Sequence, residues 1–259
     1  MQCDNAMSAL NSMLKSFDNN DDKLDYMYSI FTSIKRKVDA VLLFGPSNSP
    51  IAEQATNTFY NKKHFKNSLF PVTYTKKEIA VLPAVIATRM QLEEKSENVS
   101  PSEKYESYLK RAYLYGTGTC ELFSIVGAYF LATEFDVEVT IETIMSNNTH
   151  TYIRLNTNPE YIMDFWATMF CEYDNSREWN DFFGLEYIRN KDSEFKKEIQ
   201  LNSTELIALG NRIFTEKNTE LRLKIINDVS AEVQKELSTV QPDATFVIET
   251  SFETATLKG

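Results

Sequence analysis

The sequence predicts an α+β fold, in which helices at both ends of the chain surround a central antiparallel sheet. Helical spacing of apolar residues dominates the first 45 of the 259 residues and returns after residue 200. Between these regions, alternating segments rich in β-branched residues follow one another at 137–145, 149–155 and 161–167. Consecutive strands of this kind pair in antiparallel fashion, so we expect the sheet in the middle of the chain.

Residues 1–100 are expected to form a mainly helical N-terminal region. Apolar residues from Ala6 to Phe17 recur at helical spacing, which predicts a first helix. After the turn DNNDD, a second helix is expected from about Lys23 toward Phe44. The sequence GPSNSP then interrupts the helical pattern, and the segment 82–94 is expected to be helical or buried.

Residues 101–200 are expected to form the core. A helix is predicted from Pro101 to about Leu114, because Ser100 and Glu103 form a capping box around a proline at the first helical position. The stretch GTGTCELFSIVGAYFL follows, and its apolar spacing predicts a second helix that opens near Cys120. The three predicted strands complete this region.

Residues 201–259 are expected to form C-terminal helices and a tail. The segments NSTELIALGNRIF and TELRLKIINDVSAEVQKEL are amphipathic, which predicts two helices. The tail DATFVIETSFETATLKG alternates weakly and fits either an edge strand or a disordered end. We expect the three regions to make one compact domain.

The composition is that of a chain that can bury a sizeable core. Hydrophobic residues make up 42% of it, and only 7 glycines and 7 prolines argue against a disordered or repetitive protein. The net charge of −10 argues against binding to nucleic acid, because affinity for phosphates depends on Lys and Arg. No apolar run reaches the roughly 18–20 residues of a membrane span, and no secretory signal is recognisable at the N-terminus.

The cysteines and histidines predict neither a disulfide framework nor a metal site. The chain has three cysteines, at positions 3, 120 and 171, which is an odd number and does not fit a disulfide scaffold in a chain of this length. We therefore expect a reducing, cytosolic site of action. A zinc site formed by Cys120, His150 and Cys171 would lack the CxxC or HxxxH spacing of known sites. We therefore expect no metal and no cofactor.

Cys120 lies where two closely spaced glycines meet an apolar helix. Thr119 is a plausible N-cap, which places Cys120 in the first turn. There the unpaired backbone N–H groups and the positive end of the helix dipole favour a thiolate, although Glu121 partly opposes it. The glycines allow a tight approach of the chain, and we expect them to leave the sulfur accessible.

The second and third predicted strands bring His150 near Asp164. The turn-forming sequence NTNPE joins them, and a turn centred on Thr157 would place His150 directly opposite Asp164 and Arg154 opposite Glu160. A shift of the register by two residues would leave His150 and Asp164 diagonal on the same face of the sheet. Asp164 has apolar neighbours on both sides, where an unpaired carboxylate is costly, so it needs a partner.

Such an arrangement has a chemical use. A carboxylate bonded to one imidazole nitrogen fixes the tautomer and stabilises the imidazolium, while the other nitrogen takes a proton from a thiol. The chain has only two histidines, His64 and His150, and the one opposite an acid also follows the glycine-flanked cysteine. The residues therefore predict a Cys120-His150-Asp164 triad.

Gly118-x-Cys120 at the start of an apolar helix, followed by HTYIRL and MDFW, resembles the core of transglutaminase-like cysteine enzymes, within the wider papain-like group. The resemblance covers about residues 116–167. It implies a helix that carries the cysteine and packs on an antiparallel sheet, with Cys120 as nucleophile, His150 as general base and acid, and Asp164 as the residue that orients His150. It also implies an oxyanion site formed by the Cys120 backbone N–H and one upstream side chain, for which Gln91 is a candidate.

The resemblance implies an attack on a carbonyl that bears nitrogen in a protein substrate. Water as acceptor gives a thiol protease or a glutamine deamidase, and a lysine acceptor gives a transglutaminase; the sequence does not choose. The helical additions resemble those of compact bacterial effectors secreted into a host cell. The alternative is a non-catalytic helical interaction protein with a pseudo-enzyme core. Phe165, Trp166, Met169 and Phe170 are expected in the core or in a cleft wall. The oligomeric state stays open.

Overall fold

The computed structural model describes most of the predicted core and both groups of helices. The described residues are 8–43, 45–46, 101–135, 137, 139–144, 150–175, 178–179 and 195–240. Cys3, His64, Gln91, the segment 82–94 and the tail from residue 241 onward lie outside them. Expectations for those parts of the chain stay predictions.

The chain divides into two compact units, each assembled from segments that are distant in sequence. One, which we call the sheet unit, contains residues 1–38 and 120–212, and the second unit contains residues 39–119 and 213–259. Cys120, His150 and Asp164 all belong to the sheet unit. The predicted division of the chain into the regions 1–100, 101–200 and 201–259 of one compact domain stays a prediction.

The sheet unit contains a five-stranded antiparallel sheet, which together with the helices confirms the α+β class. Its strands lie in the order β6-β5-β4-β3-β7. They are β3 (Val139–Ile144), β4 (His150–Leu155), β5 (Tyr161–Asp164), β6 (Met169–Glu172) and β7 (Phe195–Leu201). The first three were predicted and the last two were not.

The third predicted strand is shorter than expected because the chain reverses after Asp164. Residues 165–168 form a turn in which Thr168 has a φ of 59°, in the left-handed region that residues with side chains adopt infrequently. β6 begins at the next residue and pairs Met169 with Asp164. Of the predicted strand 161–167, residues 161–164 therefore form β5, and residues 165–167 belong to the turn that leads into β6.

The predicted register between β4 and β5 was wrong by two residues. Ile153 pairs with Met163 and Leu155 with Tyr161, so the connecting loop is centred on Asn158 rather than Thr157. Within that loop the Thr157 hydroxyl donates a hydrogen bond of 2.7 Å to a main-chain carbonyl, which holds the loop together. His150 and Asp164 are consequently diagonal neighbours, and they share a face because side chains alternate with a period of two.

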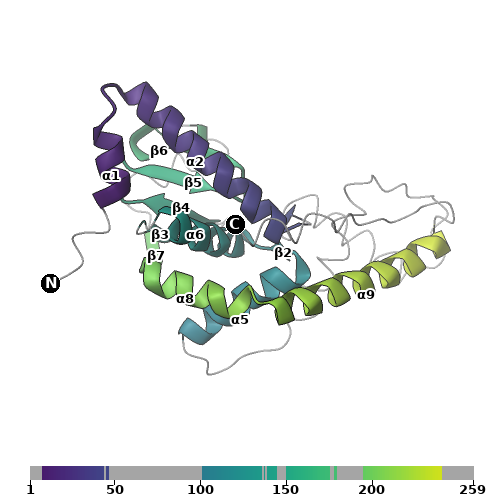
Figure 1. Cartoon of the computed structure of the whole chain (residues 1–259). Helices are drawn as coiled ribbons and strands as arrows, with labels where there is room; N and C mark the ends of the chain where they lie inside the picture. The colour runs from purple at the N-terminus through teal and green to yellow at the C-terminus, as the bar shows by residue number, and fades with distance from the viewer. Residues whose placement is uncertain are drawn as a thin grey trace. The chain divides into compact units, whose positions relative to one another are not determined.

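Two helices cover the face of the sheet opposite the one that carries His150 and Asp164. They are α2 (Asn20–Val41) and α6 (Cys120–Phe135), and Figure 1 shows α6 against β3 and β4 and α2 across β5 and β6. A further helix, α1 (Ser8–Lys15), precedes α2. Residues 122–132 of α6 are all buried. α6 is therefore a central helix, which explains why its sequence is apolar on all sides.

Phe165, which directly follows β5, packs against both of these helices. Its ring stacks on Phe31 of α2, with centroids 5.3 Å apart. On the other side the ring lies against Gly127 of α6, where a β-carbon added to the glycine would come within 2.3 Å of it. Only glycine leaves room for this approach, so the residue after Asp164 is held by the same helix that carries Cys120.

The second unit is held together by a buried arginine. Arg222 is 1% exposed and belongs to α9 (Glu216–Val240). Its guanidinium donates hydrogen bonds to the main-chain carbonyls of Val41 (2.8 Å), Ala40 (3.2 Å) and Tyr113, which end α2 and α5 (Pro101–Tyr115). A cation at two helix C-termini satisfies carbonyls that have no partner within their helices.

Outside the sheet the helices confirm the predicted ones, whereas two short strands were not predicted. β1 (Gly45–Pro46) pairs in parallel with β2 (Thr117–Gly118) in the second unit. α8 (Ser203–Ile213) and α9 are the two predicted C-terminal helices, and α5 is the helix predicted from Pro101. Among the described residues, no helix combines the length and the apolar character that a bilayer crossing requires.

Replacing Gly127 by alanine tests the packing of α6 on Phe165. We expect Gly127→Ala to lower the free energy of unfolding by about 1–3 kcal/mol, because the new methyl group collides with the Phe165 ring. Urea titration followed by circular dichroism measures the change. The double variant Gly127→Ala/Phe165→Leu should lose less stability than the sum of the two single variants, since the smaller side chain makes room. Additive losses would contradict this account.

Candidate active site

Cys120 is the first residue of α6, as the sequence predicted. Its side chain hydrogen-bonds to His150 and to the main chain and side chain of Thr151, at the beginning of β4. The expectation of an accessible sulfur was wrong, because the residue is only 7% exposed. The first turn of the helix lies close against β4, which leaves only a small part of the residue in contact with solvent.

Ser124 fixes the first turn of α6 to β4. Its hydroxyl lies one turn after the cysteine, 3.0 Å from the main-chain carbonyl of Cys120 and 3.3 Å from that of Thr151. Because the second carbonyl belongs to the residue after His150, this hydroxyl connects the two chain segments that carry the thiol and the imidazole. Neither its sequence position nor its periodicity marked Ser124 as important, since it lies in a continuous apolar run.

His150 and Asp164 are joined by a short hydrogen bond. The Nε2 atom of His150 lies 2.6 Å from Oδ2 of Asp164, and the two residues are 4% and 1% exposed. His150 opens β4 and Asp164 ends β5, so the bond joins neighbouring strands diagonally. Since Nε2 faces the carboxylate, Nδ1 is the nitrogen that can serve Cys120. The structure thus brings together all three residues of the predicted triad.

Asp164 accepts two further hydrogen bonds, which make a buried carboxylate tolerable. The indole Nε1 of Trp179 donates to Oδ2 over 2.8 Å, and the main-chain N–H of Ala167 donates to Oδ1 over 2.9 Å. Hydrogen bonds of this kind replace the water that the carboxylate loses on burial. The imidazole and the indole therefore share one carboxylate oxygen.

Trp179 is the residue of the candidate site that sequence reasoning missed. It is 3% exposed and packs edge-on against Tyr152, with ring centroids 4.6 Å apart. It also belongs to an apolar cluster with Ile144 and Ile162 on the face of the sheet that carries His150. Its sequence context, EWN, has no periodic pattern, and the only signal in the sequence was that it is one of two tryptophans.

The second tryptophan, Trp166, also lies beside the imidazole. Its ring centroid is 5.3 Å from that of His150, with the planes inclined by 59°. Phe165 is buried and Trp166, Met169 and Phe170 are partly buried, in keeping with the expectation that these four residues belong to the core or a cleft wall.

The electrostatic environment favours an ion pair between thiol and imidazole. Burial by itself would raise the pKa of Cys120, but the hydrogen bond and charge of His150 outweigh it and hold the pKa below its ordinary value of 9.0. For His150, burial by itself would lower the pKa, but the hydrogen bonds to Asp164 and Cys120 and their charges raise it from 6.5 to about 9. The two shifts act in the same sense, because each favours the charged form of its residue, thiolate for Cys120 and imidazolium for His150.

The arrangement can perform nucleophilic catalysis with proton transfer. A thiolate attacks carbonyl carbon, and a neighbouring imidazolium donates a proton to the group that leaves. The backbone N–H of Cys120 lies at the N-terminus of α6, where the positive end of the helix dipole favours a developing oxyanion. Within the described part of the chain, no group of three His, Cys, Asp or Glu side chains is arranged to hold a metal ion.

Comparison with known proteins adds no relative to this picture. No protein-family model matches the chain, and neither a curated protein nor a solved structure matches it. The geometry of Cys120, His150 and Asp164 is consequently the observation that bears most directly on function.

Replacing Trp179 by phenylalanine tests whether its indole N–H tunes the site. Without that bond the Asp164 carboxylate is held less firmly in position against the His150 ring, so the pKa of Cys120 should rise toward its ordinary value of 9.0. The pH dependence of Cys120 alkylation by iodoacetamide measures this shift. Trp166→Phe makes the same chemical change beside His150 while leaving the Trp179 bond in place, and it should shift the pH profile less. Equal shifts would show that ring size, rather than the hydrogen bond, matters.

Proposed function

We propose that the protein is a cysteine-dependent acyl-transfer enzyme that acts on a carboxamide or peptide bond of a protein substrate. The observation that supports this most directly is the continuous hydrogen-bonded series Asp164, His150, Cys120, buried at the start of a helix. Each residue alone has an ordinary structural explanation. A buried acid, imidazole and lowered-pKa thiol in series is the arrangement that nucleophilic catalysis requires.

In the proposed reaction the Cys120 thiolate attacks the carbonyl carbon and forms a C–S bond. The carbonyl oxygen becomes an oxyanion, which the Cys120 backbone N–H stabilises. Collapse of this intermediate breaks the C–N bond, and the His150 imidazolium donates its proton to the departing nitrogen. The products of this half are a thioester on Cys120 and a free amine or ammonia.

The second half of the reaction returns the enzyme to its starting state. Neutral His150 removes a proton from water, and the resulting oxygen nucleophile attacks the thioester. The C–S bond breaks, which releases a carboxylic acid and restores the thiolate and imidazolium. Water as acceptor corresponds to a protease or a glutamine deamidase, and a lysine amine in its place corresponds to transamidation.

We also propose that the fold is of the papain-like and transglutaminase-like kind. The support is a cysteine at the first turn of a helix, packed on an antiparallel sheet, with the histidine and the acid on neighbouring strands in that chain order. The proposal extends to a cytosolic site of action, reached by secretion from a bacterium into a host cell. Two free cysteines among the described residues, Cys120 and Cys171, suit a reducing compartment.

Alkylation of the native protein tests the activated thiol. Iodoacetamide should modify Cys120 in a pH-dependent manner with a midpoint below 9.0, because the hydrogen bond and charge of His150 lower the pKa of the thiol. Cys171, the other described free cysteine, serves as the internal reference in the same peptide map. In His150→Ala the midpoint should return to 9.0 or above, because burial still raises the pKa of Cys120 while the hydrogen bond and charge of His150 no longer lower it. If Cys120 in the unchanged protein reacts no faster than Cys171, the proposed catalytic role is wrong.

Catalysis itself is tested with a proteome as substrate. The unchanged protein should convert glutamine side chains to glutamate, cut peptide bonds or join lysine to glutamine, and peptide mass spectrometry distinguishes these products. Cys120→Ser should abolish conversion, and Asp164→Asn should reduce it by about 10²–10⁴-fold, as expected for loss of an effective general base. A thiol that is activated in the alkylation assay without any conversion would favour the pseudo-enzyme alternative.

A further inference from the structure

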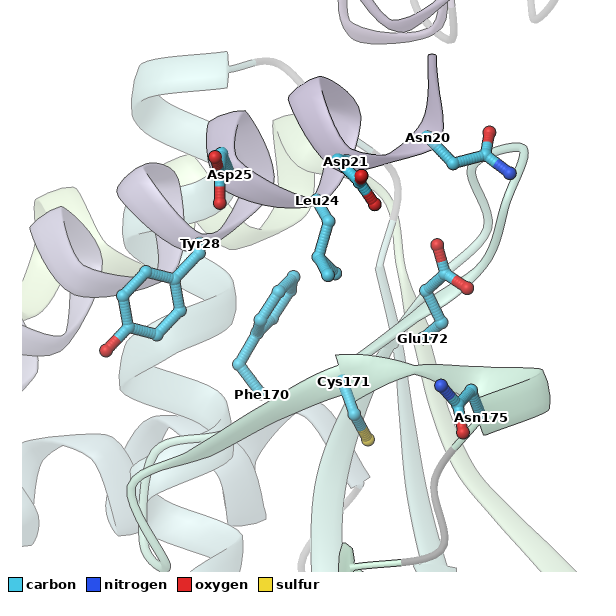
Figure 2. A pocket seen from close by; sticks show the side chains of 9 residues that line it. All are labelled: Asn20, Asp21, Leu24, Asp25, Tyr28, Phe170, Cys171, Glu172 and Asn175. Atoms are coloured by element: carbon cyan, nitrogen blue, oxygen red, sulfur yellow. The ribbon is translucent and has the colours of Figure 1, made fainter.

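A second candidate site lies in the sheet unit, between the first half of α2 and the edge strand β6. It is an open cavity of about 400 Å³ (Figure 2). The side chains that shape it come from α2 (Asp21, Leu24, Asp25 and Tyr28) and from β6 (Phe170 and Glu172). None of these six residues belongs to the Cys120-His150-Asp164 site.

The α2 side of this cavity is a helical stripe that does not face the core. Asp21, Leu24, Asp25 and Tyr28 follow the spacing i, i+3, i+4 and i+7, which places them on one face of the helix. Leu24 is 36% exposed and Tyr28 is 56% exposed. The core face of α2 is a different stripe that contains the buried residues Met27, Ile30, Phe31 and Ile34. Core packing therefore does not account for the large apolar side chains of the first stripe.

The cavity carries three carboxylates. Among the described residues that line it there is no Lys or Arg. Within the described part of the chain, Asp21, Asp25 and Glu172 form neither an ion pair nor a side-chain hydrogen bond. Like charges around a common space repel one another, and a bound cation relieves that repulsion.

The apolar part of the cavity is aromatic and firmly supported. The rings of Tyr28 and Phe170 have centroids 6.0 Å apart. Behind them, Phe170 stacks on Phe31 (5.7 Å) and on Tyr161 (5.4 Å), which fixes its orientation. Figure 2 shows Phe170 and Glu172 extending from β6 toward α2, while the sulfur of Cys171 lies on the other side of the strand.

Carboxylates beside aromatic rings are the surroundings that suit an arginine side chain. Its planar guanidinium stacks on aromatic faces and binds carboxylates with two parallel hydrogen bonds, and its methylene stem packs on apolar groups such as Leu24. A lysine ammonium offers neither the planar face nor the paired donors.

We propose that the cavity between α2 and β6 binds an arginine side chain that is presented by an extended segment of a partner protein. The charge complementarity of Asp21, Asp25 and Glu172 and the aromatic wall of Tyr28 and Phe170 select this partner. Binding requires no chemistry at Cys120, so the inference stands independently of the proposed function.

Fluorescence anisotropy with the full-length Cys120→Ser variant measures this binding. The probe is a fluorescein-labelled Gly-Leu-Arg-Leu-Gly amide, and its matched control carries citrulline, which has the shape of arginine without the charge. We expect the citrulline peptide to bind about tenfold more weakly or not at all, and the arginine peptide to bind more weakly as salt is added.

Variants assign the binding to the cavity. Asp21→Asn/Asp25→Asn should weaken binding of the arginine peptide by about tenfold, and Tyr28→Leu by about threefold. Asp18→Asn is the matched control, because Asp18 is an exposed acid just before α2 that does not line the cavity, and it should leave binding unchanged.

Four results would overturn the proposal. They are no binding of the arginine peptide at low ionic strength, equal binding of the citrulline peptide, equal weakening by Asp18→Asn, and equally tight binding of a lysine counterpart. The third result would show that the acidity of the whole chain, rather than this cavity, attracts the peptide.

Discussion

The buried carboxylate of Asp164 is the constraint on which the site depends. At 1% exposure it must find hydrogen-bond donors within the protein, and it finds three: an imidazole from β4, a main-chain N–H from the following turn and the indole of Trp179. Each donor comes from a different segment, so satisfying one charge fixes the positions of all three. The orientation of His150, and hence of the nitrogen that faces Cys120, follows from this requirement.

The same position is coupled to the helices through the next residue. Phe165 points to the opposite face of the sheet, where it lies between Phe31 of α2 and Gly127 of α6. Asp164 therefore requires hydrogen-bond donors on one face of the sheet, and the next residue, Phe165, requires close packing against the helices on the other face. Since α6 begins at Cys120, the helix that presents the thiol and the strand that presents the acid share one packing contact.

Much of this organisation could be predicted where the sequence has a strong period. The helices and the strands β3, β4 and β5 are periodic, and the order of Cys120, His150 and Asp164 along them predicted the triad. The register was missed because it depends on where a five-residue loop centres, which side-chain alternation does not determine. β6 has only four residues and the sequence FKKEIQL of β7 contains two adjacent lysines, so neither stood out. Trp179 acts through one hydrogen bond, for which no sequence period exists.

The direction of the His150 ring has a kinetic consequence. Because Nε2 is held by Asp164, every proton that moves in the proposed reaction must pass through Nδ1, beside the sulfur. The departing amine and the incoming acceptor therefore use the same nitrogen, one after the other. The acceptor cannot be activated until the amine has taken its proton and left. The proposed reaction therefore follows a double-displacement order, in which the first product departs before the second substrate reacts.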